Sequence, residues 1–281
     1  MEIFQIFSYQ FVQNALTAGL LAALASGIIG SLVVVNRMVF LAGGIAHAAY
    51  GGVGLAFYMG WPVLPSVLGF SLANSMIMGM LTRQRFERTD TVIGVIWALG
   101  MAVGIILMDL TPGYNVDLMS FLFGSILAVS SQDLMLMAVL DLVLAASVLL
   151  FYRLLLAHSY DREFLKARGV NTTAIHLFLM ALMAASVVMT IRITGLVLVM
   201  ALFTMAPYMA EKWTGSLFSM MIVASALNTL FVTAGIGLAC LLNLTSGATI
   251  ILVAACFFMV SRLPFGAAVR RWRGENLRKG G

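Results

Sequence analysis

The most constraining feature of the sequence is a set of long stretches without any charged residue. Residues 38–82 and 213–261 contain no Asp, Glu, Lys or Arg. A membrane-spanning helix needs about 20 predominantly apolar residues, so each of these runs must hold two spans with a break between them. We expect the breaks at Gly60-Trp61-Pro62 and at residues 243–247. The runs therefore predict a polytopic membrane protein.

Composition excludes the soluble classes. Hydrophobic residues make up 62% of the chain and charged residues 10%, whereas an ordinary soluble domain has about 25% charged residues. A soluble fold of this size could not bury so much apolar surface, which excludes a soluble enzyme, a disordered chain and a nucleic-acid-binding domain. The apolar runs are unbroken, unlike barrel strands, which alternate over about ten residues. We expect one all-α membrane domain over residues 1–281.

We expect eight to nine transmembrane helices, some of them broken or re-entrant. The predicted spans are residues 14–35, 39–59, 63–82, 91–109, 133–155, 172–191, 195–210, 216–237 and 247–262. The apolar piece from Met119 to Val129 is too short to cross, so we expect it to lie at the surface or to re-enter the membrane.

The basic residues predict the orientation. Along nine spans, 15 of the 16 Lys and Arg residues fall on one side, and Arg192 alone falls on the other. The positive-inside rule makes the rich side cytoplasmic. We therefore expect a cell inner-membrane protein with its N-terminus outside and a basic cytoplasmic tail at residues 263–281.

Two ionisable residues lie deep in the predicted spans. His47 is nine residues past Met38, about 14 Å into a hydrocarbon core of about 30 Å, and Asp141 is about 18 Å from Arg153. Ionisable groups at such depth are costly and mark functional candidates, and together they could ligate a passing divalent cation. A neutral histidine and a protonated aspartic acid, each bonded to a neighbouring helix, remain open alternatives.

Small residues surround His47 and recur elsewhere in the spans. Glycines 43, 44, 51, 52 and 54 share its predicted helix, where they permit close packing or an irregular backbone beside a cavity. The pairs Gly100/Gly104 and Ser71/Ser75 have the small-xxx-small spacing that lets helix backbones approach closely.

The segment 157–171 differs in character because it carries charges of both signs. Phe164, Leu165 and Arg168 could share one face of a short helix, and Gly169 provides a stop. Such a helix lying along the membrane suits docking to a soluble partner, and an ordinary connecting loop is the alternative. We expect His176, just beyond it, to lie at the headgroup interface.

Four stretches, in order and in register with the spans, resemble the permease subunits of the ABC-3 family of zinc, manganese and iron importers. They are Asn36-Arg37-Met38 leading into residues 43–52; residues 121–127 followed by Ser131-Gln132-Asp133-Leu134; Tyr160-Asp161-Arg162-Glu163 through Ala167-Arg168-Gly169; and residues 194–202 followed by Pro207 and Ala210.

The resemblance implies a homodimeric permease without a permanently bound cofactor. An extracytoplasmic solute-binding protein would deliver the metal ion, and separate ATP-binding subunits would dock on the chain. The residues implied in docking are Tyr160, Asp161, Glu163, Ala167 and Gly169. The chain has no GxxxxGK[ST], HExxH or GxSxG motif, so we expect it not to be an enzyme.

The resemblance also implies a translocation path that includes His47 as a metal ligand, Gly44 and Asn243, and we add Asp141 to it. Gly44 and Asn243 stand where the family has aspartates, so this route would hold a divalent cation less tightly. Two alternatives stay open: a permease for a metal chelate or other small solute, and a gradient-driven secondary transporter that uses His47 and Asp141 as its relay.

Overall fold

The computed structural model describes residues 10–82, 89–112 and 129–262, and in these ranges the chain forms helices and no strand. The helices are α2 (Gln10–Val35), α3 (Val39–Met59), α4 (Val63–Thr82), α5 (Thr89–Asp109), α7 (Ser131–Leu150), α8 (Tyr152–Tyr160), α9 (Arg162–Ala167), α10 (Thr172–Trp213), α11 (Leu217–Leu242) and α12 (Ser246–Arg262). The expected basic tail and all but the last residue of the short apolar piece 119–129 lie outside the described residues.

The described helices confirm the all-α membrane fold. Eight segments are long and apolar enough to cross a membrane, with α10 contributing two of them, Thr172–Ile191 and Gly195–Trp213. The apolar α12 is shorter, at 17 residues. The nine predicted spans thus correspond one to one with these eight segments and α12.

The breaks between spans occur where sequence signals placed them. Gly60 ends α3 with φ 68°, and the following amide of Trp61 donates to Ala56 O at 2.9 Å, a C-cap geometry that glycine adopts without steric cost. Inside α10, Gly195 has φ 75° and ψ 170°. That backbone region is nearly restricted to glycine, so Gly195 is what allows the chain to turn between two adjacent spans.

The fifth predicted span is shorter than expected. We predicted a helix over 133–155, whereas α7 begins at Ser131 and ends at Leu150. Ser130 and Asp133 form a reciprocal capping box that starts α7 earlier. Phe151, with φ −99° and ψ 13°, separates α7 from α8.

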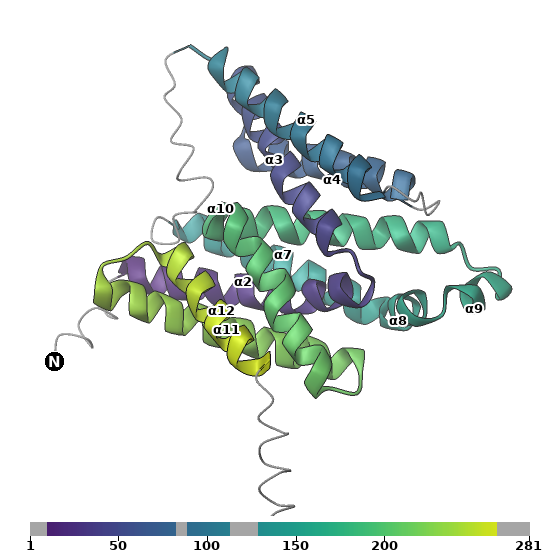
Figure 1. The fold of residues 1–281 in the computed structure, drawn as a ribbon. Coiled ribbons are helices and arrows are strands. Elements are labelled where there is room, and N and C mark those ends of the chain that lie inside the picture. The colour runs from purple at the N-terminus through teal and green to yellow at the C-terminus, as the bar shows by residue number, and fades with distance from the viewer. Residues whose placement is uncertain (1–9, 83–88, 113–128, 263–281) are drawn as a thin grey trace, which may run out of the picture.

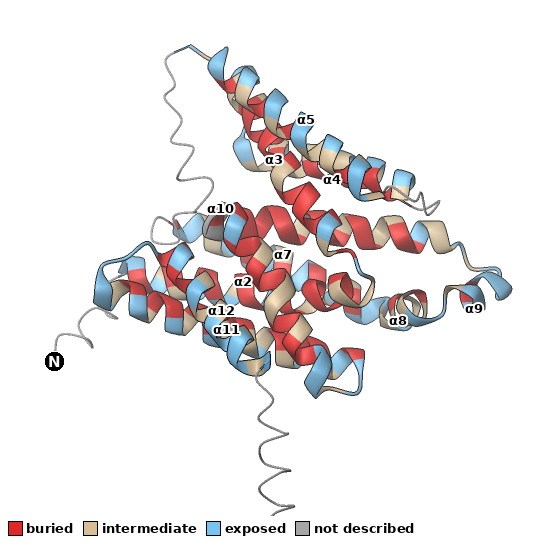
Figure 2. Ribbon diagram, in the orientation of Figure 1, coloured by how far each residue is buried: buried red, intermediate tan, exposed pale blue. Residues whose placement is uncertain are grey.

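The two halves of α10 hold the bundle together. Figure 1 shows α3, α4 and α5 as one group on one side of α10, with α2, α7, α11 and α12 on the other. α10 packs against α2, α3, α4, α11 and α12, and more lightly against α7. Burial follows this arrangement: buried residues are concentrated on α2, α3 and α10, while α5 and α7 expose apolar faces to the surroundings (Figure 2).

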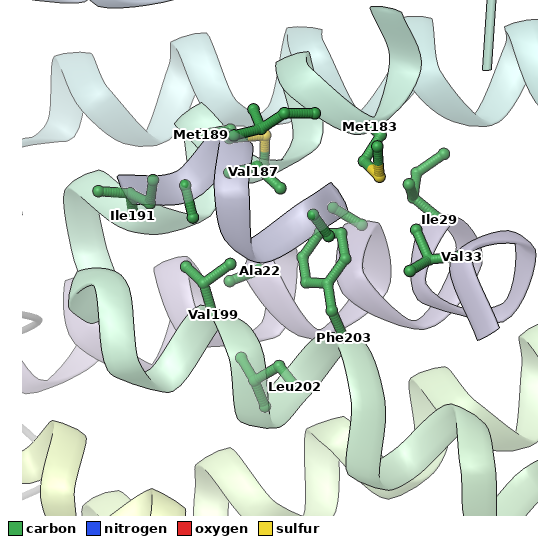
Figure 3. Close-up of a cluster of buried hydrophobic side chains, with 14 of the residues drawn as sticks. Ala22, Ile29, Val33, Met183, Val187, Met189, Ile191, Val199, Leu202 and Phe203 are labelled. Atoms are coloured by element: carbon green, nitrogen blue, oxygen red, sulfur yellow. The ribbon is translucent and has the colours of Figure 1, made fainter. Parts of the chain in front are cut away.

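The core around α10 is made of aliphatic, methionine and aromatic side chains from α2 and from both halves of α10 (Figure 3). Its labelled members are Ala22, Ile29, Val33, Met183, Val187, Met189, Ile191, Val199, Leu202 and Phe203, all at most 3% exposed. Among these residues Met183 and Met189 are packed as core side chains, the usual role of methionine in irregular interiors.

Close helix packing accounts for the small-residue pairs. A Cβ atom added to Gly100 would lie 2.7 Å from Ala48 Cα, and one added to Gly104 would lie 2.5 Å from Tyr50 O. Both distances are shorter than an ordinary contact, so α5 can approach α3 this closely only through glycine. Ser71 and Ser75 are fully buried on α4. The prediction of tight packing at these pairs is confirmed.

Candidate functional site

His47 lies in the middle of α3 and is held by an aromatic neighbour. Its imidazole stacks on Trp97 of α5 with ring centroids 4.0 Å apart and an interplanar angle of 15°. The Trp97 indole N–H donates to Met101 Sδ at 3.1 Å. The Nδ1 atom of His47 is buried and has no hydrogen-bond partner among the described residues. A neutral imidazole with an uncommitted ring nitrogen is a suitable metal ligand.

Trp97 is therefore a direct neighbour of His47 that sequence reasoning missed. Its only signal was a large aromatic side chain in the middle of an otherwise aliphatic and glycine-containing span. An aromatic ring in a span is more often a core residue than a site residue, so nothing in the sequence pairs Trp97 with His47.

The helical turn before His47 is tightly packed. A Cβ atom on Gly44 would lie 2.5 Å from Ile93 Cγ2 and 3.3 Å from Met78 Cε, and one on Gly43 would lie 2.9 Å from Met200 Cε. Gly44, a predicted path residue, thus contacts α4 and α5. An aspartate at this position would have to displace Ile93.

Asp141 and His47 are on helices that share α10 as a neighbour. Asp141 is 5% exposed, and neither carboxylate oxygen has a hydrogen-bond partner in the described part of the chain. Its helix α7 packs against α2 and α10, whereas α3 packs mainly against α5, α4 and α10. α3 and α7 do not pack extensively on each other among the described residues, and the relay or shared cation site stays a prediction.

Asn243, the last predicted path residue, is exposed in the turn between α11 and α12. Its φ of 53° and ψ of 46° are left-handed, and the amide of Leu244 donates to Ala239 O at 3.0 Å. Asn adopts this conformation more readily than most residues, so local geometry favours Asn here. Over the described ranges, no three His, Cys, Asp or Glu side chains are grouped so that they could hold a metal ion.

The predicted docking segment forms two short helices, α8 and α9, instead of one. Asp161 separates them, and its side chain accepts a hydrogen bond from the Phe164 amide at 2.9 Å. Gly169 has φ 73°, and the amide of Val170 donates to Leu165 O at 3.0 Å. Gly169 therefore ends α9 as the sequence predicted.

The exposed side of α9 differs in part from the predicted face. Leu165 is 3% exposed and anchors α9 to the bundle, so it does not share a face with Phe164 and Arg168. Phe164 is exposed, and the Arg168 guanidinium lies over its ring, 5.4 Å from the centroid. Glu163 and Lys166 form an exposed ion pair of 2.8 Å. We call the exposed residues Tyr160, Glu163, Phe164 and Ala167 the docking face.

Asn36 fastens this segment to the end of α2. Its amide donates to Ser159 Oγ at 2.8 Å, and Arg162 donates to its carbonyl oxygen at 3.5 Å. Two of the motifs quoted from the sequence, about 120 residues apart, are thereby in direct contact. A shift of α8 and α9 would be transmitted to α2 through Asn36.

His176, predicted to lie at the headgroup interface, is 6% exposed within the protein, with its ring centroid 5.9 Å from that of His158. Burial, together with the nearby Arg162 and His176, lowers the pKa of His158 to about 4, so it is neutral near pH 7. A cavity of about 390 Å³ opens here. It is lined by His158, Arg162, Glu163, Lys166, Thr172, Thr173 and His176.

Comparison with known proteins adds three findings. The family model described as the ABC 3 transport family matches residues 8–264. The chain is 46% identical over 257 residues to an uncharacterized membrane protein of Synechocystis, and 30% identical over 258 residues to the manganese transport system membrane protein MntC of Listeria monocytogenes; each alignment covers 92% of both chains. Among solved structures, PsaBC from Streptococcus pneumoniae in complex with Fab superposes with a TM-score of 0.84 and 27% identity, covering 94% of this chain and 95% of that one.

Proposed function

Because the chain belongs to the ABC 3 transport family, we propose that it is the permease of an ATP-driven importer for zinc, manganese or iron ions. The observation that carries this proposal is His47, an imidazole in the middle of a spanning helix whose Nδ1 atom is buried without a partner. A metal ion passing along α3 would satisfy that nitrogen. The relative named as a manganese transport membrane protein supports a metal as cargo.

ATP hydrolysis is assigned to a separate subunit that binds the docking face. Phe164 and Tyr160 offer apolar surface, and the Glu163–Lys166 pair offers charge. The positive-inside argument puts this face in the cytoplasm, with the N-terminus outside and the C-terminus inside. An extracytoplasmic solute-binding protein would deliver the metal ion, and two copies of this single permease domain would form the pore.

The mechanism proposed is alternating access driven from the docking face. Closure of the ATPase moves α9, which is anchored by Leu165, and α8, which is tied to α2 through Asn36. α10 begins five residues after Ala167 and packs on both helix groups. Displacement of the docking face would therefore change how the group α3, α4 and α5 sits on α10, and with it the access to His47.

The test is metal uptake by proteoliposomes that contain the chain with its ATPase. We expect His47→Ala to lower ATP-dependent uptake of manganese and zinc at least about ten-fold while the ATPase still binds, because the proposed ligand is lost. Cys256→Ala is the control, since this side chain is exposed on α12 and lies outside both the proposed path and the docking face. Equal uptake by His47→Ala and wild type would refute the role of His47.

The alternative cargo is a metal chelate or another small solute. The absence of aspartate at Gly44 and Asn243 favours it, because a route with fewer carboxylates holds a bare divalent cation less tightly. Competition between free ions and their chelates in the same uptake assay separates the two cargoes. A chelate that outcompetes the free ion would replace the metal ion in the proposal.

The gradient-driven alternative depends on His47 and Asp141 acting together. α3 and α7 both pack on α10 but do not pack extensively on each other, so the described contacts give this relay no direct support. Uptake that collapses with an uncoupler while ATP is held constant would favour it nevertheless.

A further inference from the structure

The cavity between α8, α9 and the start of α10 has the lining of an anion site. Every side chain that lines it except Glu163 can donate a hydrogen bond, and Arg162 and Lys166 are positively charged. The one carboxylate is already paired with Lys166 at 2.8 Å. The first turn of α10 also points its positive dipole end toward this region. The Asn171 side chain accepts hydrogen bonds from the amides of Thr173 and Ala174. The start of α10 therefore acts on the cavity mainly through the electric field of its dipole, and less through free N–H donors.

A buried histidine that lines the same cavity has ring nitrogens that the protein does not satisfy, which points to a ligand. His158 is 2% exposed, and neither of its ring nitrogens has a hydrogen-bond partner among the described residues. Buried polar side chains are normally satisfied. A ligand in the cavity that His158 lines would supply the partner that the protein does not.

The charges around His158 favour an anion over a cation. Arg162 donates through Nε to the backbone oxygen of His158 at 3.3 Å, which places a guanidinium beside the imidazole. The same guanidinium helps to lower the pKa of His158. A group that disfavours a proton on His158 also disfavours a metal ion there, whereas it attracts an oxyanion.

We propose that this cavity binds a phosphate group, from either the headgroup of an anionic phospholipid or a free phosphate. A volume of about 390 Å³ exceeds what one or two waters fill, at about 30 Å³ each. The cavity lies at the end of two predicted spans, where basic pockets between helices take anionic headgroups. A phosphate held by α9 and α10 would fasten the docking face to the long helix, a consequence that rests on the proposed function.

The test is anion binding to the full-length protein purified in detergent, measured by isothermal titration with sulfate. Sulfate keeps its charge well below neutral pH, so a change in its binding with pH reports on groups of the protein. We expect sulfate to bind more tightly as the pH falls toward the pKa of His158, about 4, because bound anion favours protonated His158. Arg162→Gln should weaken binding about ten-fold, the loss of one charge-assisted hydrogen bond.

Two further variants control for folding. Lys166→Gln should also weaken binding, and since that side chain is 58% exposed its loss does not endanger the fold. Arg168→Gln removes a positive charge from the same segment but from a residue that lies over Phe164 and does not line the cavity. Its affinity for sulfate should equal that of the wild type.

Native mass spectrometry of the same preparations distinguishes the sources. Retained anionic phospholipid that is lost in Arg162→Gln identifies a headgroup, and sulfate binding without retained lipid identifies a free phosphate; either result supports the site. Neither sulfate binding nor lipid retention in the wild type would overturn it. Binding of Zn²⁺ that weakens as the pH falls and is lost in His158→Gln, with no anion bound, would also overturn it and indicate a two-histidine metal site. These measurements need neither the ATPase nor the cargo, so they can fail or succeed independently of the transport proposal.

Discussion

The tight packing between α3 and α5 offers a sharp test, because α5 also provides its control. Gly104 and Gly94 both lie within α5. A Cβ atom on Gly104 would lie 2.5 Å from Tyr50 O and 2.7 Å from Tyr50 C, which are backbone atoms of α3. A Cβ atom on Gly94 would have no atom within 4 Å apart from its own helix and chain neighbours.

The expected magnitude follows from these distances. Each Gly→Ala change gains about 1 kcal/mol of helix propensity, and this gain cancels when the two variants are compared. In Gly104→Ala the backbone of α3 cannot rotate away as a side chain could, so α5 must shift by roughly 1 Å, an overpacking that costs about 1–3 kcal/mol. Gly104→Ala should therefore be about 1–3 kcal/mol less stable than Gly94→Ala.

The assay is reversible unfolding in mixed micelles with increasing dodecyl sulfate, followed by circular dichroism. Because α5 also carries Trp97, which stacks on His47, Gly104→Ala should lower metal uptake too, while Gly94→Ala should keep it. Equal unfolding midpoints for the two variants would refute the reasoning that backbone contact at Gly104 sets the spacing of α3 and α5.

Three further predictions follow from the described contacts. Burial lowers the pKa of His158 from 6.5 to about 4. The free energy of unfolding should therefore be unaffected by this group above about pH 6.5 and should fall by up to about 3 kcal/mol between pH 6.5 and pH 4. In His158→Gln, this fall of the unfolding free energy with pH should be absent. Gly169→Ala places a side chain at φ 73°, at a cost of about 1–2 kcal/mol. Gly169→Ala and Glu163→Gln, each made alone, should abolish uptake but leave oligomer size in gel filtration unchanged. Persistent uptake would exclude the docking role. Asn228→Leu removes the bonds from its amide to Ser26 Oγ and Leu202 O and should lower the free energy of unfolding by about 1 kcal/mol, whereas an unchanged unfolding midpoint would show that this contact is energetically neutral.

Much of the fold follows from local sequence because the bilayer selects spans by length and hydrophobicity. The breaks at Gly60 and Asn243 and the turn at Gly195 each need a backbone conformation that Gly or Asn adopts readily, so they too could be predicted. The end of α9 at Gly169 belongs to the same class. The boundary at Phe151 carried no such residue, and the predicted span ran past it.

The candidate site was only partly predictable. His47 stood out because an ionisable side chain deep in a span is rare, and the docking segment stood out because its charges interrupt apolar sequence. Neither signal says which side chain lies next to which. Trp97 beside His47, and His158 beside His176, were visible only in the structure.

The sequence by itself determined that this chain is a bundle of membrane helices, where most of them begin and end, and which family it resembles. The tertiary structure alone decided that His47 stacks on Trp97, and that residues 158–176 enclose a polar cavity. The physical reason is that span formation depends on the apolar character of consecutive residues. Helix pairing depends instead on how small and large side chains fit between segments far apart in the chain, as Gly104 fits against Tyr50.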